Sequence, residues 1–327
     1  MSPPPSPHRG ALAAAAYLAL VARRPSDEAT ATVRLPAGTD VAASFARFSR
    51  SGDDLLERWD GRALARCVRL ADAVVPFTAE TAGDSLLLHV TDGARLVEVT
   101  FAASSMVEPL PAGWADLIAR DTPLAPLHER YAGLRAVRVL DPFVALVHSI
   151  SAQQVNLRWA ATTRHRLASA YGDPVEIGSA RLHVLDVDRM AAADVADLRT
   201  LQLTTAKARA LVDLAAAVAD GALDLVGLAA LDDAAVVETL VRLRGIGPWT
   251  AQWYLARVLG RPVVVAGDLA VRKAVGLLYG EPTQPGPERT LELTAHWGDR
   301  ALHAQQLVLH ALGEGTLSPA GRVPSTR

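Results

Sequence analysis

Residues 243–251 read Leu-Arg-Gly-Ile-Gly-Pro-Trp-Thr-Ala, and residues 266–273 read Ala-Gly-Asp-Leu-Ala-Val-Arg-Lys. The first segment predicts the end of one helix (Ala234 to Leu243), a tight turn that needs two glycines, and a second helix that begins at Pro248. Such a turn points unpaired backbone N–H groups outward, at the positive end of the second helix's dipole. These groups predict an anion site that can hold a DNA phosphate without reading the base sequence.

A single carboxylate, Asp268, follows this turn after one helix and one crossover. At that spacing it can face a nucleotide held by the turn. An aspartate is also a favoured helix N-cap, here for a helix from Leu269 to Leu278. Its place after the hairpin favours a catalytic role over a purely structural one.

Together the two segments resemble the helix-hairpin-helix DNA glycosylase superfamily, and within it the 3-methyladenine DNA glycosylase II (AlkA) type. In that family the hairpin is followed by a helix, a crossover rich in glycine and proline, and an aspartate that attacks or stabilises the sugar. The resemblance implies that Asp268 is the catalytic residue. It also implies that the hairpin binds DNA through Gly245, Gly247, Thr250 and Arg244.

Two tryptophans, Trp249 and Trp253, lie four residues apart on the second hairpin helix and share one face. The resemblance implies that they form a stacking slot for a flipped-out base, where cationic alkylated purines gain from cation–π attraction. An ordinary packed core is the alternative. The resemblance also assigns Trp297 to the base pocket, although the residues that follow it, 299–301, depart from the family's turn and leave the range of bases open.

A second segment lies upstream, where Asp141 and Pro142 predict the start of a helix. Residues 152–155, Ala-Gln-Gln-Val, resemble the family turn that carries the wedge, the side chain that fills the hole left by the flipped base. By position the wedge is Gln154, where several relatives have leucine. The alternative is a helix end whose glutamines bond local carbonyl groups.

The counts of lysine and cysteine limit the reactions and the metal or disulfide sites that this chain can support. Lys207 and Lys273 are the only lysines, and neither falls at the hairpin position that carries the Schiff-base lysine of bifunctional relatives, where this chain has Trp249. The resemblance therefore implies a monofunctional enzyme. Cys67 is the only cysteine, which excludes a four-cysteine iron–sulfur cluster, a zinc–cysteine site and an internal disulfide. The scattered histidines predict no metal site, and the family implies only a monovalent cation held by hairpin carbonyls.

Charge and composition fit a protein with a large core, since half of the 327 residues are apolar and the net charge is −2. That balance is unusual for a DNA-binding protein. Between residues 240 and 274, however, basic side chains outnumber the single acid Asp268, and they form either a basic stripe around the site or a solvated helix face. They are Arg242, Arg244, Arg257, Arg261, Arg272 and Lys273.

The sequence predicts an α+β fold, with a small antiparallel-sheet domain followed by an all-helical domain of two subdomains. Residues 1–30 predict a disordered or dispensable extension, because residues 2–7 are rich in proline and the apolar run at Ala11–Ala22 is too short to span a bilayer. Residues 31–134 predict the α+β domain, residues 135–314 the helical glycosylase domain, and residues 315–327 a flexible tail. In the first domain we expect strands at Thr32–Leu35, Leu64–Leu70, Ser85–Val90 and Leu96–Phe101, a helix at Asp40–Phe48 and a hairpin turn at 91–94.

These features predict a monofunctional DNA glycosylase, a hydrolase without lyase activity, that acts in base excision repair. Its expected substrates are alkylated purines of the 3-methyladenine and 7-methylguanine type in double-stranded DNA. Such cationic bases leave readily, so one carboxylate suffices without a general acid. The alternatives are a glycosylase of the same fold for hypoxanthine or uracil, and a non-catalytic protein that binds DNA structure through the hairpin. We expect a cytoplasmic, nucleoid-associated monomer that has no membrane contact.

Overall fold

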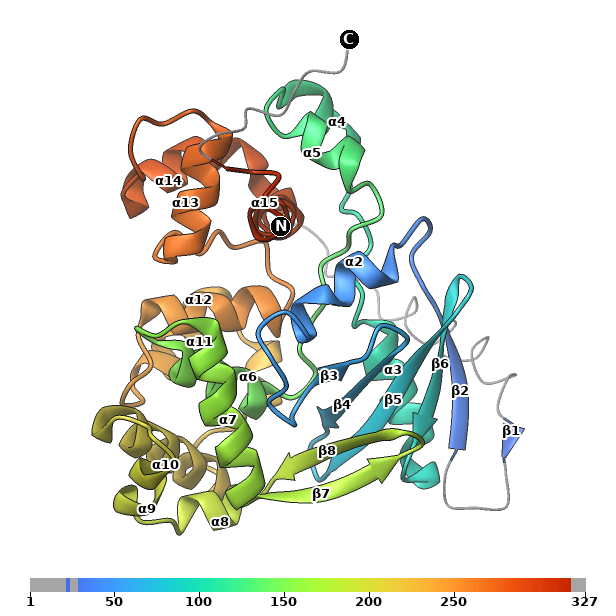
Figure 1. Ribbon diagram of the computed structural model, residues 1–327, viewed down its shortest axis with the longest axis vertical. Helices are drawn as coiled ribbons and strands as arrows, with labels where there is room; N and C mark the ends of the chain where they lie inside the picture. Colours follow the sequence, from blue (N-terminus) through green and yellow to red (C-terminus); the bar gives the residue numbers. More distant parts are fainter. Residues whose placement is uncertain (1–21, 24–28, 319–327) are drawn as a thin grey trace, which may run out of the picture.

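An antiparallel sheet lies at the lower right of Figure 1 in the computed structural model, which describes residues 22–23 and 29–318. Within these residues its strands follow the order β1-β2-β6-β5-β4-β3. Their bounds are β1 (Ala22–Arg23), β2 (Ala29–Arg34), β3 (Arg58–Trp59), β4 (Ala63–Arg69), β5 (Val74–Ala82) and β6 (Ser85–Val90). Alternate residues of β2 and β6 are buried, which is the period-two pattern of a sheet with one face on a core. The expected α+β fold class is confirmed.

Several expected elements of the sheet domain are confirmed, and one is wrong. Asp40 caps the short helix α2 (Val41–Phe45), which continues as the 3-10 turn η1 (Ala46–Phe48). The strand expected at 96–101 is instead the helix α3 (Leu96–Ser104), which packs on β2. Its buried residues recur at helical spacing, and Asp92 caps the 3-10 turn η2 (Gly93–Arg95) that leads into it, so residues 91–94 are no hairpin turn.

The domain boundaries differ from the expected ones at both ends of the sheet domain. β1 pairs with β2 through residues 22–23 and 29–30, so the sheet domain begins before the expected residue 31. Residues 1–21 of the expected extension lie outside the described part of the chain. Two helices before residue 134, α4 (Trp114–Arg120) and α5 (Ala125–Arg130), share their apolar core with helices from the C-terminal end. The described part of the expected tail, 315–318, includes Leu317, which is buried in that same core.

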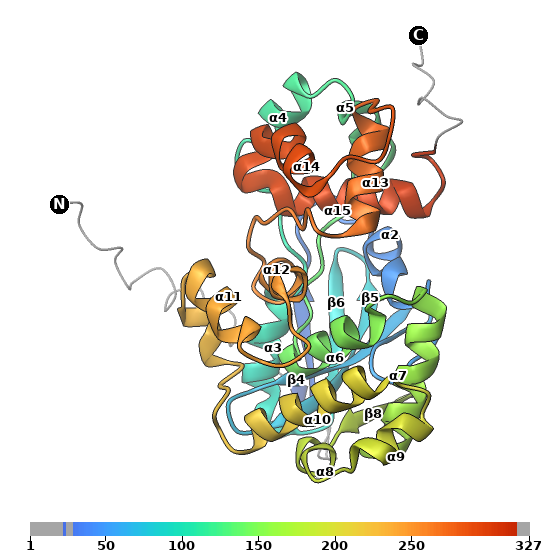
Figure 2. The same cartoon turned by 90° about the vertical axis from the view of Figure 1, so that its left-hand side faces the viewer.

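The helices form two groups, which Figures 1 and 2 show from two sides. The first group, joined to the sheet, contains α6 (Pro142–Ala152), α7 (Leu157–Tyr171), α8 (Val187–Ala191), α9 (Val195–Thr200), α10 (Thr205–Ala219), α11 (Asp233–Val241) and α12 (Pro248–Arg257). The second group contains α4, α5, α13 (Leu269–Leu278), α14 (Pro287–Thr294) and α15 (Ala301–Gly313), with the short 3-10 segment η4 (Ala295–Arg300). The two expected helical subdomains correspond to these groups.

One hairpin interrupts the region expected to be all helical. Strands β7 (Gly172–Ile177) and β8 (Ala180–Leu185) follow α7 and pack their apolar side against β4. Cys67 lies in this contact, and burial raises the pKa of its thiol. Within the described residues, no helix combines the length and the apolar character needed to cross a membrane.

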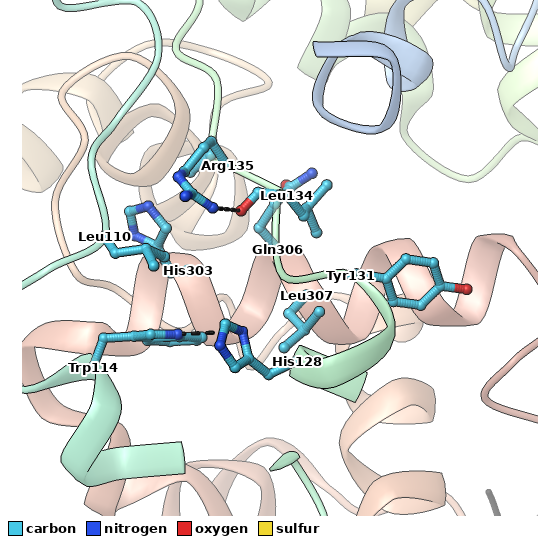
Figure 3. Close-up of a pocket in the computed structure, with 10 residues that line it drawn as sticks. Leu110, Trp114, His128, Tyr131, Leu134, Arg135, His303, Gln306 and Leu307 are labelled. Carbon is cyan, nitrogen blue, oxygen red and sulfur yellow. Dashed lines mark hydrogen bonds between the residues drawn. The ribbon is translucent and has the colours of Figure 1, made fainter. Parts of the chain in front are cut away.

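The second helical group buries a histidine, His303, beside Trp114 and His128 (Figure 3). Burial lowers the pKa of His303 to about 4, against an ordinary value of 6.5, and the nearby carbonyl of Glu108 opposes the shift. The neutral ring is therefore the form that the fold accommodates.

We expect this histidine to weaken the fold in acid. As the pH falls below 6.5, the unfolded chain takes up the His303 proton first, and the native state follows only near pH 4. The stability contributed above pH 6.5 is thus lost between these values, by up to about 3 kcal/mol. Urea unfolding of His303→Gln should show a shallower decline of stability over this pH range. His165→Gln, at an exposed histidine, is the control and should leave the slope unchanged.

Candidate active site at the helical hairpin

The backbone of the turn between α11 and α12 requires glycine at one of its two glycine positions. Gly245 has a φ of 78°, and a Cβ there would lie 2.5 Å from the Cβ of Ala210. Gly247 has a φ of −102° with nothing within 4 Å of a Cβ. The turn therefore needs glycine at 245 only, which corrects the expected need for two. The space beside Gly247 is open to a group that approaches from outside.

Gly245→Ala is expected to distort the hairpin, because alanine disfavours this positive φ and its methyl group meets Ala210. We expect a loss of about 2 kcal/mol from strain and crowding together, seen in urea unfolding. Gly247→Ala is the matched control and should leave stability within about 0.5 kcal/mol, the usual range for surface changes. A similar loss in both variants would contradict the geometry described for the turn.

Three backbone N–H groups are free at the start of α12. Those of Gly247, Trp249 and Thr250 have no hydrogen-bond partner among the described residues, and Pro248 has no N–H to offer. They lie at the positive end of the helix dipole. The side chain of Thr250 is buried and its Oγ1 has no partner, so only its backbone can contact a ligand from outside. The geometry of an anion site expected from the sequence is present.

Both carboxylate oxygens of Asp268 accept hydrogen bonds. Its Oδ1 accepts the N–H groups of Ala270 and Val271 at 2.8 and 3.1 Å, so it is the N-cap of α13. Its Oδ2 accepts the indole N–H groups of Trp249 and Trp253, both at 3.0 Å. An N-cap alone needs only the backbone contacts. The two indoles fix the carboxylate at the junction of the two helical groups, next to the start of α12.

The indole N–H groups of Trp249 and Trp253 both donate to this carboxylate, but the surroundings of the two rings differ. Trp253 is 8 % exposed, and the guanidinium of Arg257 lies 3.9 Å from its ring centroid. Trp249 is only half-buried, and the ring contacts of the described residues include none to it. A base can therefore reach the ring of Trp249 more readily than that of Trp253. Sequence spacing predicted the pair but not the arginine stacked on one member.

Trp297 does not line an open pocket, which corrects the sequence-based assignment for this structure. Its side chain is 0 % exposed and packs within the second helical group. The indole N–H donates to the hydroxyl of Tyr279 at 2.9 Å, and Tyr279 donates to Asp121. Burial and the neighbouring carboxylate raise the pKa of Tyr279. A buried indole whose N–H has partners is a core residue here.

The Gln153–Gln154 turn lies beside the hairpin, although the two are far apart in the sequence. Gln153 ends α6, and its side-chain amide donates to the carbonyl of Gly245 at 2.8 Å. Gln154 follows with a φ of 56° and an exposed side chain. The side chain of Gln153 thus bonds the hairpin rather than a local carbonyl, and the turn presents Gln154 to solvent. Its role as a wedge stays a prediction.

The basic residues near the hairpin do not form a free stripe. Arg244 pairs with Asp213 at 3.2 Å, Arg242 pairs with Glu238, and Arg261 lies 3.5 Å from Asp233. Arg257 is turned inward onto Trp253. Most of these side chains therefore fit the alternative, a solvated helix face, better than a basic stripe around the site. Arg244, 64 % exposed, remains able to exchange its partner for a phosphate.

Comparisons with known proteins find similarity to base excision DNA repair proteins. Residues 147–299 match the family model described as HhH-GPD superfamily base excision DNA repair protein. A DNA-3-methyladenine glycosylase of Bacillus subtilis (strain 168) is 27 % identical over 199 residues, which span 56 % of this chain and 65 % of that protein.

Two solved structures share the fold over most of this chain. A 3-methyladenine DNA-glycosylase from Archaeoglobus fulgidus has a TM-score of 0.76 at 21 % identity, covering 88 % of this chain and 99 % of that one. The 8-oxoguanine glycosylase/lyase of Clostridium acetobutylicum, solved with double-stranded DNA, has a TM-score of 0.68 at 18 % identity, covering 91 % and 98 %. At these identities the structures establish the fold.

Proposed function

Because the chain belongs to the HhH-GPD superfamily of base excision DNA repair proteins, and within it to the AlkA type, we propose that it is a DNA glycosylase that removes damaged purines from double-stranded DNA. The observation that carries this proposal is the carboxylate of Asp268, fixed by two indoles beside a helix start with three free N–H groups. A protein that only grips DNA has no use for such a carboxylate. The name of the Bacillus subtilis relative favours alkylated purines as substrates.

The proposed reaction is hydrolysis of the bond between C1′ of the sugar and the base nitrogen. The hairpin amides hold a phosphate, and the damaged base turns out of the duplex. As the C1′–N bond breaks, the bonding electrons leave with the base and positive charge develops on the sugar, which Asp268 faces and stabilises. A water oxygen then bonds to C1′ and its proton passes to solvent. This leaves an abasic site.

The absence of lyase activity is part of the proposal. Strand cleavage by the bifunctional route needs an amine that forms a Schiff base with C1′. At the hairpin position Trp249 donates its N–H to Asp268 and supplies no nucleophile. Lys207, one of the two lysines, donates to the carbonyl of Ser151 and is thereby engaged elsewhere.

A monovalent cation at the hairpin also stays a proposal. The carbonyls of Leu243 and Gly245 each accept one hydrogen bond, and a carbonyl oxygen has a second lone pair to offer. Neutral oxygens of this kind suit a weakly bound hard cation. When bound, it would add positive charge near the phosphate held by the amides of α12.

The test is base release from methylated double-stranded DNA by the purified protein, with a chelator present. Released bases are identified by chromatography, and strand breaks are scored before and after alkali. We expect methylated purines in solution and breaks only after alkali. Breaks without alkali would contradict the monofunctional proposal. Binding to DNA without release of methylated or deaminated bases would favour the non-catalytic alternative.

A further inference from the structure

An open groove of about 490 Å³ lies between α7 and the loop that follows η1. Its lining is polar and mostly cationic: the loop contributes Arg50 and Asp53, and α7 contributes Arg158, Thr162, His165 and Arg166. Because Arg158, Thr162 and Arg166 follow one another at intervals of four residues, they share one face of the helix. The α7 wall of the groove therefore carries two arginines, about 12 Å apart along the helix axis.

These two arginines have no carboxylate partner, unlike the other charged groups of the groove. Asp53, the only carboxylate in the lining, pairs with Arg58 at 2.7 Å, and Arg50 has a glutamate partner. Among the described residues, no carboxylate oxygen lies within 4.0 Å of a guanidinium nitrogen of Arg158 or Arg166. The groove thus keeps two uncompensated positive charges, in a chain whose net charge is −2.

Neutral groups hold the guanidinium of Arg166 in place. It donates to the side-chain oxygen of Gln202 at 2.6 Å, and it lies 5.5 Å from the ring centroid of Trp159. These contacts position the guanidinium without cancelling its charge, so its other N–H groups can bind an anion. Arg158 is exposed, and its side chain makes no hydrogen bond to the described residues. Both arginines are therefore available to an anion that enters the groove.

The groove begins close to the turn that carries the proposed wedge. Gln154 is exposed, and Arg158 follows it by four residues, in the first turn of α7. The neighbouring side chains of Leu157 and Trp159 are 61 % and 39 % exposed, so the start of the helix presents apolar groups beside the basic one. Phosphates of one strand of duplex DNA recur about every 3.4 Å along its axis, so the two arginines span about three or four nucleotides. A strand that passes Gln154 can therefore continue along the groove.

We propose that this groove is a second DNA-binding site, in which Arg158 and Arg166 hold phosphates of the DNA that flanks the flipped nucleotide. The inference rests on the proposed function, because DNA held at the hairpin supplies these phosphates. Contacts of this kind add affinity and orientation without reading the base sequence. The hairpin amides and the groove then hold the DNA at two places, with the Gln154 turn between them.

The experiment compares Arg158→Gln with the wild-type protein on a duplex that carries a stable abasic-site analogue at its centre. Fluorescence anisotropy gives the affinity over a range of salt concentrations. An arginine that neutralises one phosphate contributes about 0.9 to the steepness of log affinity against log salt. We therefore expect the slope to become shallower by about 1, and the affinity to fall by about fivefold to tenfold near 0.1 M salt. Arg166→Gln should act alike, whereas Arg158→Lys keeps the charge and should retain the slope.

Two further duplexes, each shortened on one side of the abasic site, locate the contact. On one of them Arg158→Gln and the wild type should bind alike, because the phosphates that reach the groove are missing. On the other the difference should persist. A difference of equal size on both duplexes would overturn a contact in the groove, since it would arise from the overall charge of the protein.

The control is Arg120→Gln, at an exposed arginine of α4 that also has no carboxylate partner among the described residues. It should change neither the affinity nor the slope. Wild-type binding by both Arg158→Gln and Arg166→Gln would overturn the groove proposal and leave the proposed function intact. No binding of any duplex by the wild type would overturn the proposed function itself. Binding of inorganic phosphate that Arg158→Gln abolishes, with DNA affinity unchanged, would show a site for a free anion and overturn its assignment to DNA.

Discussion

Asp268→Asn is expected to lower the single-turnover rate of base release by about 10²- to 10³-fold, while affinity for DNA changes little. The reason is that asparagine removes the negative charge that faces the developing charge on the sugar, and loss of one such stabilising group costs about 3–4 kcal/mol of barrier. In the proposed function, DNA binding rests on the free amides of α12 and on Arg244, which the substitution does not alter. Release assays and fluorescence anisotropy with the same duplex measure the two quantities.

The same variant also changes a helix cap, so a matched control is needed. Asp232 caps α11 through the N–H of Ala235 at 2.8 Å, but no tryptophan N–H of the described residues donates to it. Asp232→Asn should therefore reproduce any cost of altering a cap without changing base release. If Asp268→Asn loses stability and DNA affinity together, and its rate falls only in proportion, then Asp268 is a structural cap and the catalytic assignment is wrong.

The parts of the site that were predictable from sequence are those set by local rules. Pro248, Asp141 and Asp268 each begin or cap a helix within a few residues of the expected place, because capping depends on neighbours in the sequence. The starts of α12 at Pro248 and α13 at Leu269 determine where the hairpin amides and the Asp268 carboxylate lie. The spacing of Trp249 and Trp253 then brings both indoles to Asp268.

The parts that escaped prediction depend on contacts across the fold. Residues 96–101 alternate apolar and polar side chains well enough for a strand, and only packing on β2 shows that they form a helix. Gln153 and Gly245 are 92 positions apart, so no local pattern joins them. Arg257 could have been noticed, because it lies four residues after Trp253 on one helix face. Its contact with the ring of Trp253 is visible only in three dimensions.

A buried ion pair joins this site to the sheet domain. Glu57 pairs with Arg66 of β4, and both side chains are almost fully buried. Arg66 also donates to the carbonyl of Arg138 at 2.9 Å, and His148 of α6 lies 3.8 Å from the second oxygen of Glu57. α6 ends at the turn that is braced on the hairpin. The pair therefore lies between the sheet and the helix that presents Gln154.

Glu57→Ala is expected to destabilise the protein by about 3–5 kcal/mol, because it leaves the Arg66 charge buried without a partner. Glu80→Ala, which breaks an exposed pair with Arg62 on the same sheet, should cost less than about 1 kcal/mol. Urea unfolding compares the two. Replacing both partners, as Glu57→Leu with Arg66→Met, should recover most of the loss, since the penalty arises from the unpaired charge. A double variant as unstable as Glu57→Ala would show that the contacts of Glu57 with α6, rather than the charge of Arg66, hold the sheet against the helices.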